Sequence, residues 1–169
     1  MAVQNIATGK AEVLPPGELK NKDGKFDLLD DHCLSCTAKE VDERVLWLHG
    51  APPCHTFTFA RRTDKHGKVP ILRDPDHPEG WGQPEVEEAN ALAERMAALA
   101  EQCYKRGGFF SIENQEDSYT RQLESYRRRA RLPEARPTMV NPRAHGGQHF
   151  KPIAISTNAP WKSAEARRC

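Results

Sequence analysis

Residues 45–54 read VLWLHGAPPC, in which four apolar residues are followed by a turn-forming His-Gly-Ala-Pro-Pro segment. A short apolar run bounded by such breakers is typical of a strand that is buried on both faces. Residues 109–112 read FFSI and form a second run of this kind. A long polar loop and a helix-like segment lie between the two runs. The order strand, loop, helix, strand predicts a βαβ unit whose two strands are parallel.

The segment after the long loop carries the clearest helix signals in the chain. Pro84 suits the first helical position, and Gly107 and Gly108 provide a stop. Four apolar side chains recur inside this segment with helical spacing, namely Leu92, Met96, Leu99 and Cys103. The spacing predicts one apolar stripe that faces the core.

Weaker signals predict the remaining elements. We expect a short strand at residues 26–29, a helix within residues 30–43 and a last strand at residues 153–155. Residues 119–132 are rich in arginine and predict a further helix, which prolines 133 and 137 would break.

The domain organisation follows from these elements. Residues 1–24 are polar and predict an arm rather than a packed element, and residues 25–169 predict one domain. Residues 56–82 form a long surface loop, and such loops are often functional. The expected fold is a loop-rich α/β domain, in which a partial Rossmann-like, mostly parallel sheet carries flanking helices.

Composition limits the classes of protein to consider. The chain has 169 residues, with 25 lysines and arginines against 24 aspartates and glutamates, so its formal net charge is +1. This balance excludes a protein that binds polyanions through bulk charge, and leaves local basic patches. Hydrophobic residues make up 37% of the chain, enough for one modest core. Eleven glycines and thirteen prolines predict many turns and irregular connections.

The sequence also bears on location. No apolar stretch approaches the roughly 18 to 20 residues that a membrane span needs, so we expect no membrane partner. The N-terminal residues show no secretory signal, and the five cysteines lack the spacing of a disulfide framework. These features predict an intracellular protein of the nucleus or cytoplasm with reduced thiols.

Polar residues that could carry chemistry follow both strands of the βαβ unit. Pro53 and Cys54 come after the first strand, and Glu113 and Asn114 come after the second. In an open parallel sheet, ligands bind beyond the carboxyl ends of the strands. We therefore expect the Cys54 thiol and the Glu113 carboxylate at the same edge of the sheet.

At these residues the chain resembles the cytosine-5 DNA methyltransferases. The family has a Pro-Pro-Cys loop that supplies a nucleophilic cysteine, and a Glu-Asn loop whose glutamate holds the flipped cytosine. Here the two loops read APPCHTFT at residues 51–58 and IENQEDS at residues 112–118. A His-Pro-x-Gly loop at residues 77–80, Asn90 on the helix and the ending at residues 151–169 extend the resemblance. The ordered set is more specific than any single motif.

The resemblance implies a mechanism and a set of site residues. Cys54 would attack C6 of cytosine, since a thiolate is a soft and strong nucleophile, and Glu113 would hydrogen-bond or protonate the ring at N3. The DNA base would be flipped into a pocket. Further DNA-contacting residues would be Pro53, Asn114 and Arg61. Residues near S-adenosylmethionine would be Asp27, Asp30 and Asn90.

The chain departs from the family in its cofactor half. No strand followed by a Phe-x-Gly-x-Gly turn is present, and residues 80–82, Gly-Trp-Gly, follow no convincing strand. Gln115 replaces the usual proline, and there is no Gln-x-Arg-x-Arg motif. These departures predict a divergent or incomplete methyltransferase-like segment that is inactive in isolation. A partner chain would then complete the fold and the S-adenosylmethionine site.

Two alternatives remain open. One is a non-catalytic structural or nucleic-acid-binding subunit, which would use an arginine-rich stretch that includes Arg127, Arg128 and Arg129 to contact phosphates. The other is a zinc site. It would use His32, Cys33 and Cys36 as one half and residues 54–55, Cys-His, as the other, although this spacing matches no recognised finger.

Overall fold

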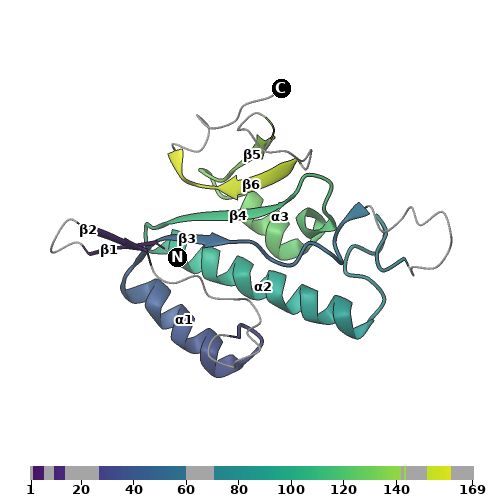
Figure 1. The fold of residues 1–169 in the computed structure, drawn as a ribbon, viewed down its shortest axis with the longest axis horizontal. Coiled ribbons are helices and arrows are strands. Elements are labelled where there is room, and N and C mark those ends of the chain that lie inside the picture. The colour runs from purple at the N-terminus through teal and green to yellow at the C-terminus, as the bar shows by residue number, and fades with distance from the viewer. Residues whose placement is uncertain are drawn as a thin grey trace.

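A computed structural model describes residues 2–5, 10–13, 27–59, 71–141, 143 and 152–160. In this part of the chain, three α-helices pack side by side on one face of a six-stranded sheet (Figure 1). The helices are α1 at Asp31–Glu43, α2 at Pro84–Lys105 and α3 at Glu124–Ala130, and a 3-10 turn, η2, spans Tyr119–Gln122. The predicted α/β class is therefore confirmed.

The sheet has the strand order β2-β1-β3-β4-β6-β5. Its strands are β1 at Ala2–Asn5, β2 at Lys10–Val13, β3 at Val45–Gly50, β4 at Phe109–Gln115, β5 at Arg136–Val140 and β6 at Ile153–Thr157. β3 and β4 pair in parallel, with Trp47 opposite Phe109 and Gly50 opposite Ile112. Because α2 connects these two strands, the predicted βαβ unit is present.

The prediction of a mostly parallel sheet is wrong. Among the described strands, β3 with β4 is the only parallel pair, and the other four pairings are antiparallel. β6 lies between β4 and β5 and is antiparallel to both, so β4 and β5 point the same way without touching as neighbours. Antiparallel neighbours need no helical crossover, and the sequence pattern therefore gave no sign of this insertion.

The core lies between the sheet and the helical layer. Leu48 of β3 and Phe110 and Ile112 of β4 are buried against the apolar stripe of α2. All four side chains of the predicted stripe are buried, which confirms that prediction. α3 adds Tyr126 to the same cluster.

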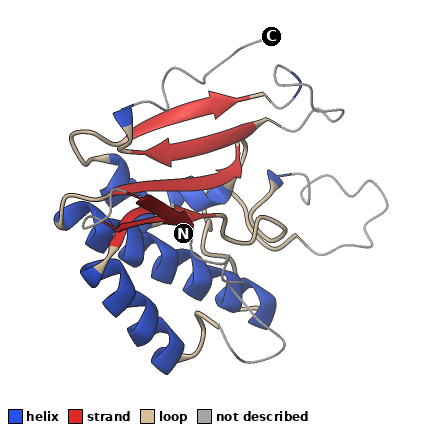
Figure 2. Ribbon diagram, turned by 60° about the vertical axis from the view of Figure 1, so that its left-hand side comes forward, coloured by secondary structure: helices blue, strands red, loops and turns tan. Residues whose placement is uncertain are grey.

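β3 is not buried on both faces, contrary to the prediction. Leu48 is buried and the next residue, His49, is exposed, while Trp47 is partly buried. The described helices all cover the same side of the sheet (Figure 2), so no helix shields the other side. There, the Ser111 hydroxyl binds the indole N–H of Trp47 at 3.0 Å and lies 2.8 Å from Nδ1 of His49.

Two further expectations are corrected, and one strand, β5, was not foreseen. Residues 1–24 contain β1 and β2, which form a hairpin against β3, so the polar N-terminal segment is not only an arm. β5 was not expected because Pro137 interrupts it, but β5 is an edge strand, where a missing N–H is tolerated. The expected arginine-rich helix is divided at Leu123 into η2 and α3.

Helix boundaries have local causes. The Asp30 carboxylate caps α1 by accepting from the N–H of Cys33 at 2.8 Å. Pro84 begins α2, as predicted. None of the helices in the described residues combines the length and the apolar character that crossing a membrane requires.

Gly107 and Gly108, which follow α2, serve different purposes. Gly107 has φ +83°, a left-handed conformation that favours glycine, and a Cβ added there would meet nothing within 4 Å. A Cβ added at Gly108 would lie 2.7 Å from Sγ and 3.0 Å from the carbonyl oxygen of Cys103. Gly108 is therefore required for space, and Gly107 for its backbone conformation.

We expect Gly108→Ala to lower the free energy of unfolding by ~1–3 kcal/mol, because the added methyl group overpacks a buried junction. Gly107→Asn should cost less, since asparagine tolerates the left-handed conformation. Urea unfolding of the two variants and the parent chain measures both effects. Equal losses in the two variants would contradict this division of roles.

Candidate functional site

The two polar clusters lie at one edge of the sheet. Parallel pairing puts the carboxyl ends of β3 and β4 together. The Cys54 loop begins directly after β3, and Glu113 and Asn114 belong to the last three residues of β4. Their location at a common edge was predicted from the sequence and is confirmed.

The segments that follow the two strands also contact each other. Thr58 and Ser118 form an antiparallel bridge, and the N–H of Tyr119 donates to the carbonyl of Phe57 at 2.9 Å. The rings of Phe59 and Tyr119 have centroids 4.2 Å apart. Backbone pairing and aromatic packing thus fix the Cys54 loop against the turn that follows Glu113.

Cys54 lies at the start of a tight turn. Its carbonyl accepts from the N–H groups of Phe57 and Thr58, each at 3.1 Å. Pro52 is buried, whereas Pro53 and Cys54 are half-buried. The loop is therefore anchored on both sides of a thiol that keeps contact with solvent.

Glu113 and Asn114 point to different surroundings, as successive residues of a strand do. Glu113 is half-buried and lies opposite Ile155 of β6. Asn114 is buried, and its side-chain amide donates to the Thr120 hydroxyl at 2.9 Å. The Thr120 hydroxyl lies 2.6 Å from that of Ser118. Asn114 therefore holds the turn, and Glu113 is the more accessible of the two.

Arg73 holds the Cys54 loop through its contacts, and little in the sequence pointed to this role. Its side chain is 2% exposed, and its guanidinium carbon lies 3.8 Å from the centroid of the Phe57 ring. Nε donates to the Thr56 carbonyl at 3.0 Å, and Nη2 donates to the Thr56 hydroxyl at 3.2 Å. The only hint in the sequence is the apolar pair before it, of which Leu72 is buried and returns the long loop to the core, while Ile71 is exposed.

The remaining donors of Arg73 reach the residues 77–80 loop and α2. Nη1 donates to the Pro78 carbonyl at 2.6 Å and to Oδ1 of Asn90 at 2.8 Å, and Nη2 donates to the Val86 carbonyl at 3.3 Å. All five N–H groups of the guanidinium are therefore used. Burial lowers the pKa of Arg73 to about 10, so the side chain remains charged near neutral pH.

Asn90 belongs to the same network. Its Oδ1 accepts from Arg73, and its Nδ2 donates to the carbonyl of Glu79 at 2.8 Å. Both groups of the amide are thus engaged inside the protein, which gives this predicted cofactor residue a structural role. The resemblance motifs at residues 51–58 and 77–80 and at Asn90 are joined physically through one arginine.

The two aspartates predicted near the cofactor also make local bonds. One Asp27 carboxylate oxygen accepts from the N–H of Leu29 at 2.8 Å. Asp30 caps α1, and the hydrogen bonds from Cys33 lower the pKa of its carboxyl group. α1 connects to β3 through Arg44 alone, so its N-terminus lies at the same end of the sheet as Cys54.

The arginine-rich segment is not a uniform basic surface. Arg127 is exposed, whereas Arg128 forms an ion pair with Glu101 of α2 at 3.1 Å. Arg129 is buried, with its guanidinium carbon 4.2 Å from the Tyr126 ring centroid and 5.6 Å from that of Phe110. Burial lowers the pKa of Arg129. Arg129 therefore packs in the core and is not presented to a phosphate.

Other predicted residues are separated from the site or lie outside the described part. Arg61 is outside the described residues. Within the described ranges, no group of three or more His, Cys, Asp or Glu side chains is arranged to hold a metal ion, so Cys54 and His55 do not complete a site with the cysteines of α1.

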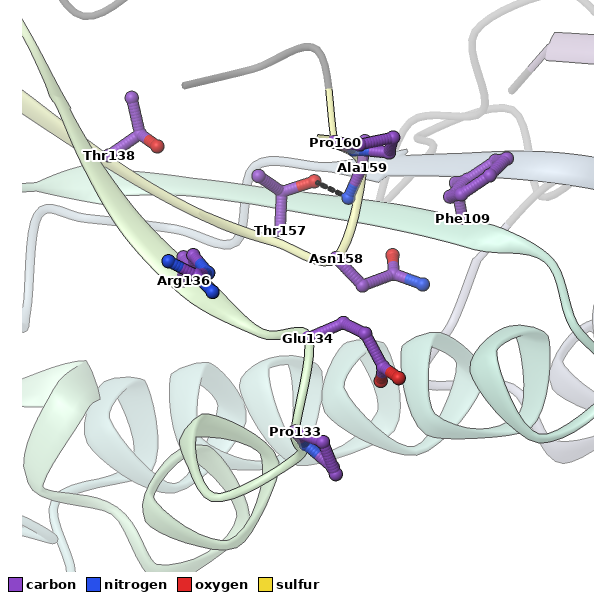
Figure 3. Close-up of a pocket in the computed structure, with 9 residues that line it drawn as sticks. All are labelled: Phe109, Pro133, Glu134, Arg136, Thr138, Thr157, Asn158, Ala159 and Pro160. Carbon is purple, nitrogen blue, oxygen red and sulfur yellow. Dashed lines mark hydrogen bonds between the residues drawn. The ribbon is translucent and has the colours of Figure 1, made fainter.

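The opposite end of β4 borders a cavity of about 470 Å³ (Figure 3). Thr157 and Asn158 line this cavity, but their side chains are hydrogen-bonded to backbone groups. The Thr157 hydroxyl donates to the Phe110 carbonyl and accepts from the N–H of Ala159 at 3.0 Å. The Asn158 side chain accepts from the N–H of Phe110 and donates to the Gly108 carbonyl. These hydrogen bonds hold the C-terminal end of β6 against β4. Cys54 is not among the residues that line the cavity.

Comparison of the chain with protein-family models, with curated proteins and with solved structures gives no significant match.

We expect Arg73→Met to lower the free energy of unfolding by about 3–5 kcal/mol, because removal of one member of a buried hydrogen-bonded network leaves the other groups unpaired. The methionine fills much of the volume, so the loss reports the polar contacts. Arg127→Met, at an exposed position, should change stability by less than about 0.5 kcal/mol. Urea unfolding measures both, and similar stabilities of the two variants would contradict the role of Arg73.

Proposed function

We propose that this chain is a divergent cytosine-5 DNA methyltransferase-like segment in which Cys54 is the nucleophile. The observation that carries the proposal is the joining of the Cys54 loop to the Glu113 turn. The two follow parallel neighbouring strands and are paired through Thr58 and Ser118. A thiol and a carboxylate at adjacent strand ends are the two groups that addition to a pyrimidine ring requires.

The chemistry proposed for these residues is addition to the base. The Cys54 thiolate forms an S–C6 bond, and the electron pair of the C5–C6 double bond moves to C5. Glu113 assists by hydrogen bonding or proton donation at N3, which offsets the charge that develops on the ring. Elimination completes the sequence after C5 has gained a proton or a methyl group: a base removes a proton from C5, its electron pair forms the C5–C6 double bond again, and the S–C6 bond breaks with the thiolate as leaving group.

The remaining members of the proposed site have supporting roles. Pro53 would set the direction of the Cys54 loop, and Asn114 would hold the turn that carries Glu113, through its bond to Thr120. Arg61 would contact the DNA backbone or base. A flipped base must enter a pocket, and the half-buried state of Cys54 and Glu113 leaves both groups accessible from one edge.

A partial Rossmann-like arrangement belongs to the same proposal. β3, β4 and β5 point in one direction, α2 connects the first two, and η2 with α3 connects the second to the third. Ligands of such sheets bind beyond the carboxyl ends of the strands, where Cys54 and Glu113 lie.

The described residues do not fit S-adenosylmethionine by themselves. Both amide groups of Asn90 are hydrogen-bonded within the protein, and one carboxylate oxygen of Asp30 is hydrogen-bonded at the N-terminus of α1. The chain also lacks the Gly-rich turn after a strand. We therefore propose that a partner chain supplies the methyl-donor half, and that this chain alone does not transfer methyl groups.

The addition step can be tested without a methyl donor. A DNA oligonucleotide carrying 2-pyrimidinone at the target position lacks the 4-amino group, which makes C6 more electrophilic. We expect the reduced chain to form a covalent adduct with it, visible on a denaturing gel and by intact mass. Cys54→Ser should abolish the adduct, and Glu113→Gln should slow it by about 10²–10⁴-fold because proton transfer is lost.

Cys33→Ser is the matched control, since this half-buried thiol lies on α1, and its adduct should form at the parent rate. An adduct that survives in Cys54→Ser, or no adduct with the parent chain on single-stranded or duplex DNA, would contradict the nucleophile assignment. Calorimetry separately tests the proposal that the cofactor site is incomplete. Low-micromolar affinity of the isolated chain for S-adenosylmethionine would contradict that proposal.

A second candidate is a non-catalytic nucleic-acid-binding or structural subunit. The exposed side chains of Arg121, Arg127 and Arg131, on and beside η2 and α3, favour the nucleic-acid form of this candidate. Arg128 and Arg129 contribute less to such a surface, because one is paired with Glu101 and the other is buried.

For this candidate, DNA affinity should fall steeply with salt, and the double variant Arg127→Ala/Arg131→Ala should reduce the log–log slope by about 1 to 2, because each neutralised phosphate contributes about 0.7 to 0.9. Arg44→Ala, at the residue that follows α1 and pairs with Glu40, is the control and should leave the slope unchanged. Titrations at several salt concentrations measure the slope. Salt-sensitive binding without an adduct indicates a nucleic-acid-binding subunit, and an unchanged slope in the double variant excludes this surface.

A further inference from the structure

The exposed face of α1 carries a pair of metal-ligating side chains that the proposed function does not use. His32 and Cys36 are four residues apart and exposed, and Sγ of Cys36 lies 3.8 Å from Nε2 of His32. The opposite face of α1 is fixed in the fold by buried Thr37 and Val41. The pair is therefore held on a packed helix rather than on a loose segment.

The spacing of the pair suits a tetrahedral metal ion. Zinc lies about 2.0 Å from a histidine nitrogen and about 2.3 Å from a cysteine sulfur, so two such ligands are about 3.5 Å apart in a tetrahedral site. The observed 3.8 Å needs only a small side-chain adjustment. Zinc favours this combination of imidazole and thiolate ligands.

The electrostatic surroundings also suit a bound dication. The Asp30 carboxylate, which caps α1 by accepting from the N–H of Cys33 at 2.8 Å, adds a negative charge near His32, whereas Asp31 is paired with Arg95 at 2.7 Å. The charge of Asp30 opposes the repulsion between the helix N-terminus and a cation.

One chain cannot complete the site. Within the part of the chain that the structure describes, no group of three or more ligating side chains surrounds a common point, so the pair offers two ligands where zinc needs four. Among the described elements, α1 lies at the outer side of the helical layer and contacts α2 and β3 (Figure 1). The formal net charge of +1 gives two copies little reason to repel.

We propose that His32 and Cys36 of two copies of this chain bind one Zn²⁺ between them and form a metal-bridged dimer. Each Cys36 thiol loses its proton to solvent, so one zinc ion bound by two copies releases two protons, and each His32 binds as the neutral imidazole. The bridge lies on α1, and the Cys54 site of each copy is not part of it. The proposal does not depend on the function proposed above.

Cadmium is a suitable probe, because thiolate bonds to Cd²⁺ give an ultraviolet charge-transfer band. We expect the reduced full-length chain to bind half an equivalent of Cd²⁺, and light scattering to show a doubling of mass with Cd²⁺ or Zn²⁺. His32→Ala and Cys36→Ser should each abolish the mass doubling, and a chelator should reverse it. Cys33→Ser, one residue from His32 on the same helix, should leave both signals unchanged.

Three results would overturn the proposal. One is a mass doubling that persists in His32→Ala. Another is a charge-transfer band that needs Cys33 and saturates at one equivalent on a monomer, which would indicate a site within one chain. The third is the absence of any metal-dependent change in mass. Without metal, the unfolding curves of His32→Ala and Cys36→Ser should match the parent curve. Loss of the metal-dependent mass doubling then cannot be explained by misfolding.

Discussion

The geometry of the candidate site depends on one buried charge. Arg73 is removed from water with no carboxylate among the hydrogen-bond acceptors that the described residues offer it, yet each of its five N–H groups has an acceptor and its plane stacks on Phe57. Such a cation is stable only if the surrounding carbonyls remain in position. The constraint is mutual: the loop at residues 51–59 orders the arginine, and the arginine prevents the loop from moving away from α2. A lysine has too few donors to satisfy the same acceptors.

The Cys54 loop is held from two directions by different forces. Arg73 fixes it to α2 through charge-assisted hydrogen bonds, and Tyr119 fixes it to the turn after β4 through the backbone and ring packing. The chemistry that we propose requires a thiol and a carboxylate held at a constant distance and orientation, and catalysis loses efficiency when reacting groups are displaced by even about 1 Å. Residues far from any substrate can therefore be essential to the geometry of the thiol and the carboxylate.

Much of the helical layer could be predicted from the sequence. Pro84, the glycines after Lys105 and the spacing of the apolar stripe defined α2, because each of these signals acts within a few residues. The parallel pairing of β3 and β4 followed from the helix between them.

Long-range pairing was less predictable. β6 inserts between β4 and β5 through contacts that no local pattern encodes, and β5 contains a proline that usually argues against a strand. Among the site residues, the edge shared by Cys54 and Glu113 was foreseen. The burial of Arg73 and Arg129 was not, since arginine is almost always assigned to the surface, and only the folded core supplies the acceptors around Arg73 and the aromatic rings beside Arg129.

Pro137 has a consequence for how the sheet meets other chains. β5 is the outermost strand on its side, and an outermost strand normally offers free N–H and C=O groups on which a foreign strand can add. The pyrrolidine ring removes a donor at the second residue of β5, and the charged Arg136 beside it is exposed. Sheet extension and fibril-like self-association are therefore disfavoured at this border.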